Sequence, residues 1–188
     1  MDLRRFLLQS SELPNWAGAD DFVAEWAQTS LAKGAHLTRQ DMPETEEFIV
    51  LEGQLVSSIC DPDGKEVCVG FHHGPCVITP NIARTRNGNS LVSIEAMTDA
   101  KIARIESDRL TDLMISSEPV RNWANAILQD ALSRKADREW CLAALGGADR
   151  LAWFREIYPA YEEIFTHSLI ASYLGVTPVT LSRLRNAK

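Results

Sequence analysis

"EEFIVLEGQLVSSICDPDGKEVCVGFHHGP", residues 46–75, contains short runs rich in valine, isoleucine and phenylalanine, separated by Gly53, Asp63-Gly64 and Gly74. Such runs between turn-forming residues are typical of β-strands. The "DPDGK" segment predicts a hairpin, because Asp-Gly accepts the positive φ that tight turns between strands demand. "SLVSIEAM" (90–97) and "AKIARIES" (100–107) continue the pattern. Residues 34–105 therefore predict a β-sandwich or barrel rather than alternating βαβ units.

Helical patterns flank this β segment, which makes the expected fold class α+β. Before it, two short helices are predicted within residues 1–31, split by Pro14, because apolar side chains recur there at helical intervals: Leu3, Phe6, Leu7, Phe22, Val23, Trp26, Ala27 and Leu31. After it, residues 118–145 predict one long helix, with Pro119 in the first turn and Gly146-Gly147 just past the end.

The long helix carries a narrow apolar seam. The seam alternates spacings of four and three residues and consists of Val120, Ala124, Ile127 and Ala131. A narrow seam with small alanines suits a second copy of the same helix and predicts a dimer. The alternative is that the stripe packs on the β domain of its own chain. Trp123 fits either arrangement.

The C-terminal segment predicts a helical hairpin. "ADRLAWFREIY" (148–158) is a helix ended by Pro159, and "THSLIASYLGVTPVTLSRLRN" (166–186) follows. Within the latter, one helix begins near Ser168 and ends at Gly175, and a second begins at Pro178 with Thr177 as its N-cap. Helix, glycine-containing turn and helix form the helix-turn-helix layout.

The second helix of this hairpin has a polar outer face. Leu181 and Leu184 face the first helix, whereas Arg183 lies about 200° from Leu181 on the outside, near Val179 and Ser182. An arginine in the major groove can bind guanine O6 and N7, and serine or threonine can bind bases or phosphates. A helical hairpin with an exposed arginine also occurs without DNA binding, so the pattern leaves both interpretations open.

The charge distribution points in the same direction. The chain has 188 residues and a formal net charge of −7, yet Arg183, Arg185 and Lys188 make residues 166–188 basic, without any acidic side chain. Such an asymmetry of charge between segments is typical of proteins that bind a polyanionic partner. The alternative is that these cations only complement a helix dipole.

Targeting and metal-binding signals are weak. No apolar run approaches the roughly 18 residues of a membrane span, and the N-terminal apolar stretch is short for a signal peptide, so we expect a cytoplasmic protein without membrane contact.

No C-x-x-C pair joins the four cysteines: Cys60, Cys68, Cys76 and Cys141. Free thiols are expected and no metal is predicted, although the equal spacing of the first three leaves an iron–sulfur site as an alternative.

The order of a β-roll with glycines at 34, 53, 64 and 74, a long helix and "IASYLGVTPVTLSRLR" resembles the cyclic-AMP receptor protein and fumarate–nitrate regulator (Crp/Fnr) superfamily of bacterial transcription factors. The resemblance covers nearly the whole chain and is closest to short-tailed Crp-like proteins. It implies a cyclic-nucleotide-binding-domain-like β-roll of the double-stranded β-helix or jelly-roll type (1–116), a dimerisation helix (117–145) and a DNA-binding helix-turn-helix (146–188). The β-hairpin wing that follows the recognition helix in better-known members is not expected here.

The resemblance also implies a DNA-binding set. Arg183 falls on the base-reading arginine of the family, and the full set is Thr177, Pro178, Val179, Ser182, Arg183 and Arg185. Val179 departs from the glutamate that many members carry at this position. Valine can at most contact a thymine methyl group, so the preferred DNA sequence is expected to differ.

The effector positions depart further. Members that bind cyclic AMP carry a Gly-Glu pair and an Arg-Ser/Thr-Ala triplet, and the matching positions here are Ile78 with Thr79 and Ser90, Leu91, Val92. A phosphate without a cationic partner is costly to bury, which argues against cyclic AMP and predicts no cofactor. Arg84 and Arg86 lie between these segments and either rescue an anion site or form a solvated loop.

We expect a homodimeric regulator that binds double-stranded DNA, and the resemblance allows an unidentified small-molecule effector and RNA polymerase as further partners. One alternative is a vestigial sensor that acts through protein–protein interaction without DNA. Another is a cupin-like metal enzyme using His72-His73, but adjacent residues on a strand point to opposite faces. A non-enzymatic role is therefore favoured.

Overall fold

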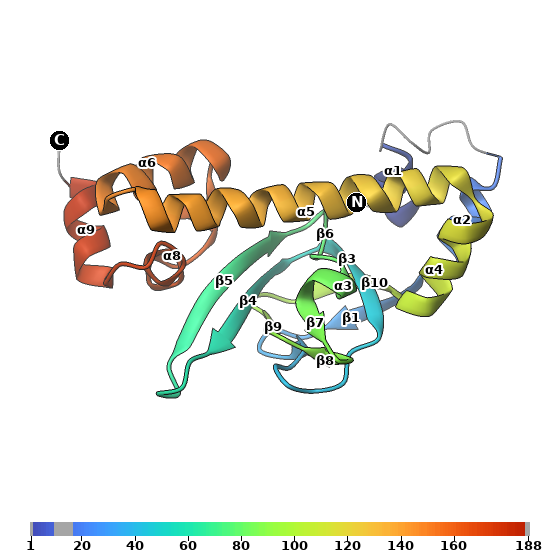
Figure 1. Cartoon of the computed structure of the whole chain (residues 1–188), viewed down its shortest axis with the longest axis horizontal. Coiled ribbons are helices and arrows are strands. Elements are labelled where there is room, and N and C mark those ends of the chain that lie inside the picture. The colour runs from blue at the N-terminus through green and yellow to red at the C-terminus, as the bar shows by residue number, and fades with distance from the viewer. Residues whose placement is uncertain (1, 10–16, 187–188) are drawn as a thin grey trace.

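The computed structural model describes residues 2–9 and 17–186, and Pro14 and Lys188 lie outside these ranges. A β-roll and a group of helices lie along one long helix, α5 (Figure 1). The strands are β1 (Ala27–Leu31), β2 (His36–Thr38), β3 (Glu46–Glu52), β4 (Gln54–Cys60), β5 (Glu66–His73), β6 (Cys76–Val77), β7 (Thr85–Arg86), β8 (Asn89–Ser90), β9 (Ser93–Ala96) and β10 (Ala100–Glu106). The helices are α1 (Leu3–Leu8), α2 (Ala19–Ala24), α3 (Asn81–Arg84), α4 (Ser107–Ser116), α5 (Glu118–Ala144), α6 (Gly147–Ile157), α7 (Tyr161–Ile164), α8 (His167–Tyr173) and α9 (Pro178–Asn186).

The roll consists of two facing antiparallel sheets. Their strand orders are β1-β10-β3-β6 and β2-β9-β4-β5, and β7 and β8 form a separate short ribbon. The fully buried side chains between the sheets include Phe48, Val50, Leu55, Ile94 and Ile102. Alternating apolar residues on facing strands bury one side of each sheet, which is the sandwich arrangement that the sequence predicts. The predicted α+β class and β-roll are confirmed.

The two turns that join β3, β4 and β5 depend on glycine. Gly64 has a φ of +79° in the predicted hairpin, where Asp61 Oδ1 accepts hydrogen bonds from the amides of Asp63 and Lys65 at 3.0 and 2.8 Å. Gly53 has a φ of +101°, and a Cβ there would lie 2.7 Å from the Ala100 Cβ. Any other residue at position 53 would be strained and would also collide with the neighbouring strand.

One predicted helix is wrong at its C-terminal end. α1 and α2 lie in the predicted region, but residues 27–31 form strand β1, which pairs antiparallel with β10 from Ala27↔Arg104 to Leu31↔Ala100. The apolar spacing of Ala27 and Leu31 fits a helix as well as it fits an edge strand. The segment forms a strand because it pairs with the edge of β10, which is distant in sequence.

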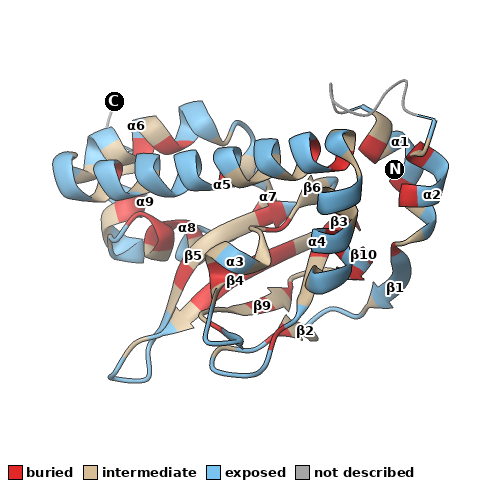
Figure 2. Ribbon diagram, turned by 45° about the vertical axis from the view of Figure 1, so that its right-hand side comes forward, coloured by how far each residue is buried: buried red, intermediate tan, exposed pale blue. Residues whose placement is uncertain are grey.

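Most of the predicted seam on α5 packs inside its own chain. Val120, Trp123 and Ala131 are buried, and the Trp123 ring lies 5.5 Å from Phe22 and 6.2 Å from Trp26. Ala124 and Ile127 are half-buried against the same cluster. The stripe therefore covers the N-terminal helices and the roll, which is the alternative to a dimer seam. Figure 2 shows that most of the remaining surface of α5 is exposed.

The C-terminal helices pack on the body of strand β5, away from the β4–β5 turn. Phe71 of β5 lies 4.6 Å from the Phe165 ring and 5.1 Å from the Tyr173 ring, within a larger aromatic cluster. The amide of Cys68 donates a hydrogen bond to Ser172 Oγ at 3.0 Å. α8 is therefore attached directly to the roll as well as through α5. The sequence signals missed α7, which follows Ala160 at a φ of 68°.

We predict that Trp123→Ala lowers the free energy of unfolding by about 3–5 kcal/mol, because it removes a buried aromatic side chain and leaves a cavity. Trp140, on the same helix, is 58% exposed, so Trp140→Ala should change stability by no more than about 0.5 kcal/mol. Urea unfolding followed by circular dichroism measures both. Equal losses in the two variants would contradict the packing described for α5.

Candidate nucleic-acid interface and effector pocket

The helix-turn-helix has the local geometry that its sequence predicts. Thr177 caps α9, since its Oγ1 accepts a hydrogen bond from the Thr180 amide at 3.0 Å. Gly175 turns the chain with a φ of +66°. Leu181 is fully buried against Ile170 and Ala171 of α8. These contacts hold α9 at a defined angle and leave its opposite side free.

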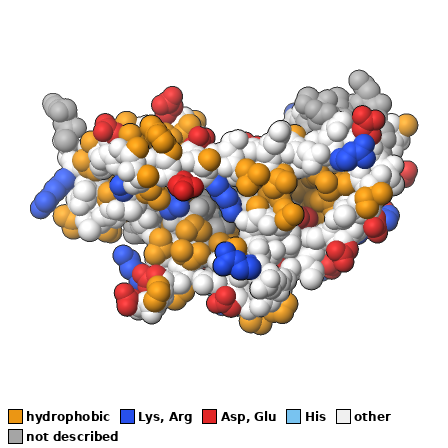
Figure 3. All heavy atoms as spheres, viewed as in Figure 1, with side chains coloured by type: hydrophobic (Ala, Val, Ile, Leu, Met, Phe, Trp, Pro, Cys, Tyr) orange, Lys and Arg blue, Asp and Glu red, His pale blue; other side chains and the backbone are white. Residues whose placement is uncertain are grey.

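The outer side of α9 presents most of the predicted DNA-binding set. Val179 is 61% exposed, and Pro178, Ser182 and Arg183 are also exposed. In the part of the chain that the structure describes, Arg183 makes no hydrogen bond or ion pair with other protein groups. Figure 3 shows basic side chains projecting from this end of the molecule. Arg183 is thus a free guanidinium on the exposed face of a capped helix.

Arg185 is in a different environment from Arg183. Its Nε lies 2.9 Å from Glu162 Oε1, and its Nη1 lies 3.0 Å from His167 Nδ1. Glu162 also binds Arg155 at 2.5 Å, and the hydrogen bond from Arg155 is the main reason that the pKa of this carboxyl is lowered. Residues two apart on a helix point about 200° apart, so Arg183 and Arg185 do not share a face. Part of the predicted set is therefore already engaged within the protein.

A cavity of about 630 Å³ lies between the roll and α5. Its lining brings together three segments: the strands β4 and β5, the residues around α3, and the second half of α5. Ile78, Thr79, Leu91 and Val92, which match the family's effector contacts in sequence, all line it. Ser90 does not line it, because this buried side chain turns back and donates a hydrogen bond to the Val92 carbonyl at 2.7 Å. The predicted effector positions thus converge, with Ser90 as the exception.

Arg84 neither lies in a solvated loop nor offers a free anion site. Its side chain is buried, its Nε donates to the Thr79 carbonyl at 2.9 Å, and its Nη1 lies 3.4 Å from the Glu44 carboxylate. It also donates to the Glu46 carbonyl and lies over the Phe48 ring. Burial lowers its pKa, and the neighbouring glutamates oppose that shift. Arg84 therefore ties the α3 segment to β3. Arg86 is exposed on β7.

A buried histidine forms part of the cavity wall. His72 Nε2 lies 2.7 Å from Ser57 Oγ, and burial lowers the pKa of His72 to about 4, with smaller contributions from Arg134 and Arg84. Its neighbour His73 is exposed, so the two rings point to opposite faces of β5, as the sequence predicts. Among the described residues, no group of three or more His, Cys, Asp or Glu side chains is placed to hold a metal ion.

Sequence inspection did not single out several residues at these sites. Lys135, Arg138 and Glu139 of α5 line the cavity. Lys135 and Arg138 lie three residues apart, so they share one side of the helix and could have indicated a basic site. Charged residues on a long helix are normally solvated, however, and the pattern alone does not separate the two cases. Which of them face the roll depends on how α5 is rotated about its axis. That rotation is set by Val120 and Trp123 near the other end of the helix.

The chain resembles known proteins both in sequence and in fold. Residues 28–117 match the family model described as "Cyclic nucleotide-binding domain", and no curated protein sequence matches the chain. A putative transcriptional regulator of the crp/fnr family from Eubacterium rectale is 22% identical, with a TM-score of 0.66 over 94% of this chain and 87% of its own. This is the Crp/Fnr fold. The resemblance inferred from the sequence is confirmed at the level of fold.

Other Crp/Fnr structures agree. FixK2 from Bradyrhizobium japonicum has a TM-score of 0.71 at 20% identity, covering 86% of this chain and 83% of its own. A CooA mutant from Carboxydothermus hydrogenoformans has a TM-score of 0.73 at 19% identity, covering 96% and 81%. The Crp/Fnr architecture therefore extends over the roll, α5 and the C-terminal helices. No helix in the described residues is both long and apolar enough to cross a membrane.

We predict that the stability of the wild type falls by about 2 kcal/mol between pH 7 and pH 5 through His72 alone. The folded-state pKa of His72, about 4, lies below its unfolded value of roughly 6.5, so the unfolded chain binds the extra proton as the pH falls through this window. His72→Gln should lose this part of the pH dependence, and His73→Gln should keep it. Urea unfolding at both pH values measures the difference. Parallel pH profiles for wild type and His72→Gln would contradict the burial of a neutral imidazole.

Proposed function

We propose that the protein is a cytoplasmic, homodimeric transcription regulator that binds a two-fold symmetric DNA site through α9. The observation that carries this proposal is Arg183, an exposed guanidinium on the outer face of a capped second helix, without an ion pair to any of the described residues. In the Crp/Fnr fold, such a helix enters the major groove, and dimers place two of them about one DNA turn, roughly 34 Å, apart.

The exposed side chains suggest a division of roles. Arg183 supplies the bidentate contact to guanine, and Ser182 and Thr177 contact neighbouring phosphates or bases. Val179 contacts a thymine methyl group. Arg185 is held by Glu162 and contributes a phosphate contact only after that ion pair opens or rearranges. Sequence recognition therefore depends mainly on Arg183.

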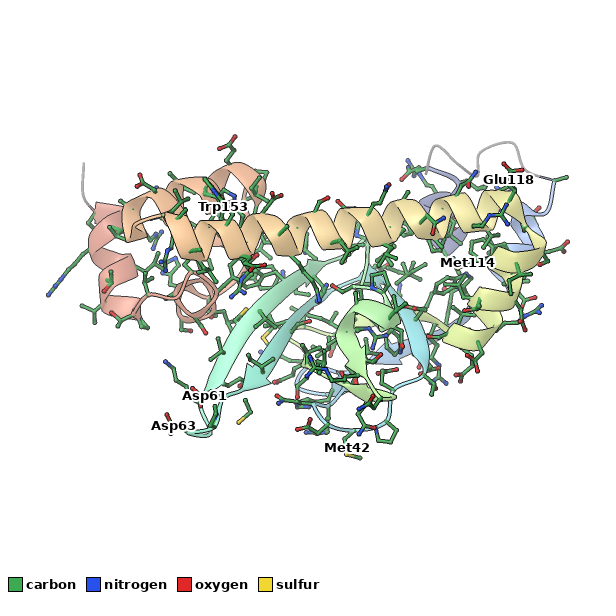
Figure 4. The ribbon with its side chains drawn as sticks, in the orientation of Figure 1. Met42, Asp61, Asp63, Met114, Glu118 and Trp153 are labelled. Carbon is green, nitrogen blue, oxygen red and sulfur yellow. The ribbon has the colours of Figure 1, made fainter. Side chains whose placement is uncertain are left out.

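For the dimer we propose a different surface of α5 from the seam predicted in the sequence. The α5 strip consists of Asn125, Leu128, Leu132 and Ala136, and it lies about 120° around the helix from Val120. Leu132 is 51% exposed. Leu128 of the strip, together with Ala124 and Ile127 beside it, borders an apolar cavity of about 450 Å³ that Met114 of α4 also lines. Figure 4 shows Met114 below α5, and Figure 3 shows hydrophobic side chains gathered over this region.

A second α5 packed on the α5 strip would cover Leu132 and the apolar surface beside it. An interface along α5 would also run close to the effector cavity, because Leu142 and Ala143, farther along the same α5, line that cavity. The dimer therefore connects the apolar face, the cavity and the two recognition helices.

The cavity between the roll and α5 is proposed as a small-molecule effector site, but not for cyclic AMP. Thr79 and Ser90 carry no charge where the family resemblance implies a glutamate and an arginine. Arg84 is committed to protein carbonyls and Glu44. The volume of about 630 Å³ lies within the range of small-molecule sites in proteins.

We predict that Arg183→Ala weakens binding to the cognate site by about 1–3 kcal/mol and relaxes the preference at one base pair in each half-site. Selection of duplexes from a random DNA pool at fixed, near-physiological salt measures this, with wild type and variant in parallel. Enrichment of the same sequence by both proteins would refute the role of Arg183. If the wild-type dimer enriches no sequence, with or without a cell metabolite extract, the protein-interaction alternative replaces DNA binding.

We predict that Leu132→Glu weakens dimerisation by roughly 100-fold or more, because a symmetric interface would bury two unpaired carboxylates. Analytical ultracentrifugation measures the change. Met42→Glu is the matched control, since Met42 is 54% exposed and lies on the far side of the roll from α5 (Figure 4). If Leu132→Glu dimerises as well as Met42→Glu, the α5 strip is not the interface.

A further inference from the structure

The cavity between the roll and α5 has two chemically different walls. The roll contributes apolar side chains: Ile59, Val69, Ile78, Leu91 and Val92. The α5 wall carries the cations Lys135 and Arg138. A smaller cavity of about 110 Å³ shares Lys135 and Arg138 and reaches the tyrosines of the C-terminal helices. Figure 3 shows basic side chains below α5 in the middle of this face.

Lys135 has no acidic partner in the part of the chain that the structure describes. Its Nζ donates to the Ala83 carbonyl at 2.5 Å, at the end of α3. Partial burial lowers the pKa of this ammonium group, and no nearby carboxylate offsets the shift. The Lys135 side chain is exposed, and an ammonium group bonded only to a neutral carbonyl would be stabilised by an added anion.

Arg138 is also bonded only to neutral groups. Its Nη2 donates to the carbonyls of Tyr173 and Cys68 at 3.1 and 3.4 Å, and its guanidinium lies 4.5 Å over the Tyr173 ring. Its Nε is buried without a hydrogen-bond partner among the described residues. An unused buried N–H is costly, so this side chain has both a charge and a donor to offer a ligand.

The other charged groups around the cavity do not neutralise this pair. Arg84 is paired with Glu44, and Arg134 with Asp130. Burial keeps His72 neutral at pH 7. Glu139 is the acidic residue among the described lining, and its side chain is exposed. An exposed carboxylate four residues from a lysine on a helix interacts weakly, so the net charge toward the cavity is positive.

From this arrangement we propose that the effector is a small organic anion, a carboxylate or phosphate with an apolar body, whose charged group binds between Lys135 and Arg138. The apolar body packs on Ile78, Leu91 and Val92. This inference rests on the proposed effector site. It places recognition of the anion on the long helix, whereas the positions that match the cyclic-AMP contacts of the family are uncharged. Two cationic donors converging on one oxyanion form charge-assisted hydrogen bonds, which are among the strongest in proteins.

Binding at this position would change how α8 is held. Arg138 now links α5 to the Tyr173 carbonyl in α8 and to Cys68 in β5. An anion competes for the same N–H groups, so its binding weakens the attachment of the helix-turn-helix to the roll. The effector would thereby loosen α8 without contacting α9. A neutral ligand of the same shape would fill the cavity and leave this attachment intact.

The test uses calorimetric titration of the full-length protein with matched probes: 4-phenylbutyrate, phenyl phosphate and the neutral amide 4-phenylbutyramide. We expect at least one anion to bind about tenfold or more tightly than the amide. Lys135→Met and Arg138→Met should each remove most of that difference, whereas Lys135→Arg and the distant Lys65→Met should preserve it. Val92→Trp should abolish binding of all three probes by filling the cavity.

Several outcomes would overturn the proposal. They are binding of no anion, equal affinity for the anion and the amide, unchanged anion affinity in Lys135→Met, or unchanged anion affinity in Val92→Trp. Circular dichroism identifies any variant that fails to fold, and Arg138→Lys then replaces Arg138→Met. No DNA is present, and Arg183→Ala should bind the probes normally, so failure here is distinct from failure of the DNA-binding proposal.

Hydrogen exchange tests the effect on α8. The preferred anion should speed amide exchange in residues 167–174 of the wild type, and the amide probe should not. Identical exchange with the two probes at saturation would refute competition at Arg138, while leaving the calorimetric result to decide the ligand class.

Discussion

The packing of one face of α5 is the constraint on which the rest of the structure depends. Near its start, Val120 and Trp123 complete the cluster formed by the N-terminal helices and the roll. Farther along, Cys141 is fully buried and Arg138 bonds to both β5 and α8. A helix of 27 residues is about 40 Å long, so one element reaches from the N-terminal helices past the roll to the C-terminal helices. Its rotation about its own axis decides which side chains face the roll and which remain for a partner.

The second organising feature is whether each charged side chain inside the fold has a partner that compensates its charge. The charge of Arg84 is compensated by Glu44 and its side chain bonds to carbonyls, although its buried Nη1 has no hydrogen bond among the described residues; His72 is bonded to Ser57. Lys135 and Arg138 bond only to uncharged acceptors, and Arg138 retains an unused donor. The difference between compensated and uncompensated cations separates structural charges from those that can recognise a ligand. It also links the cavity to the helix-turn-helix, because Arg138 lines the cavity and donates a hydrogen bond to the Tyr173 carbonyl of α8.

Local signals predicted the elements that local chemistry determines. Asp63-Gly64 marked the β4–β5 hairpin, Pro119 and Gly146 marked the ends of α5, and Thr177 marked the start of α9. The fourfold and threefold spacing on α5 marks residues that pack mainly within the same chain, which is one of the two arrangements that the pattern allows. A seam of that width fits either the same chain or a second copy, and only the position of Phe22 and Trp26 distinguishes them. Residues 27–31 were misassigned for a related reason, because an edge strand depends on a partner far away in sequence.

The sequence by itself determined the α+β class, the order of roll, long helix and helix-turn-helix, and the outward direction of Arg183 relative to Leu181. These follow from periodicity, turn residues and caps, which act within a few positions along the chain. Only the tertiary structure decided that Arg84 is buried and paired, that Arg185 binds Glu162, and that Lys135 and Arg138 share a cavity with Ile78 and Leu91. Those facts depend on how segments far apart in sequence approach each other, because burial and charge compensation are properties of the assembled fold and not of any one segment.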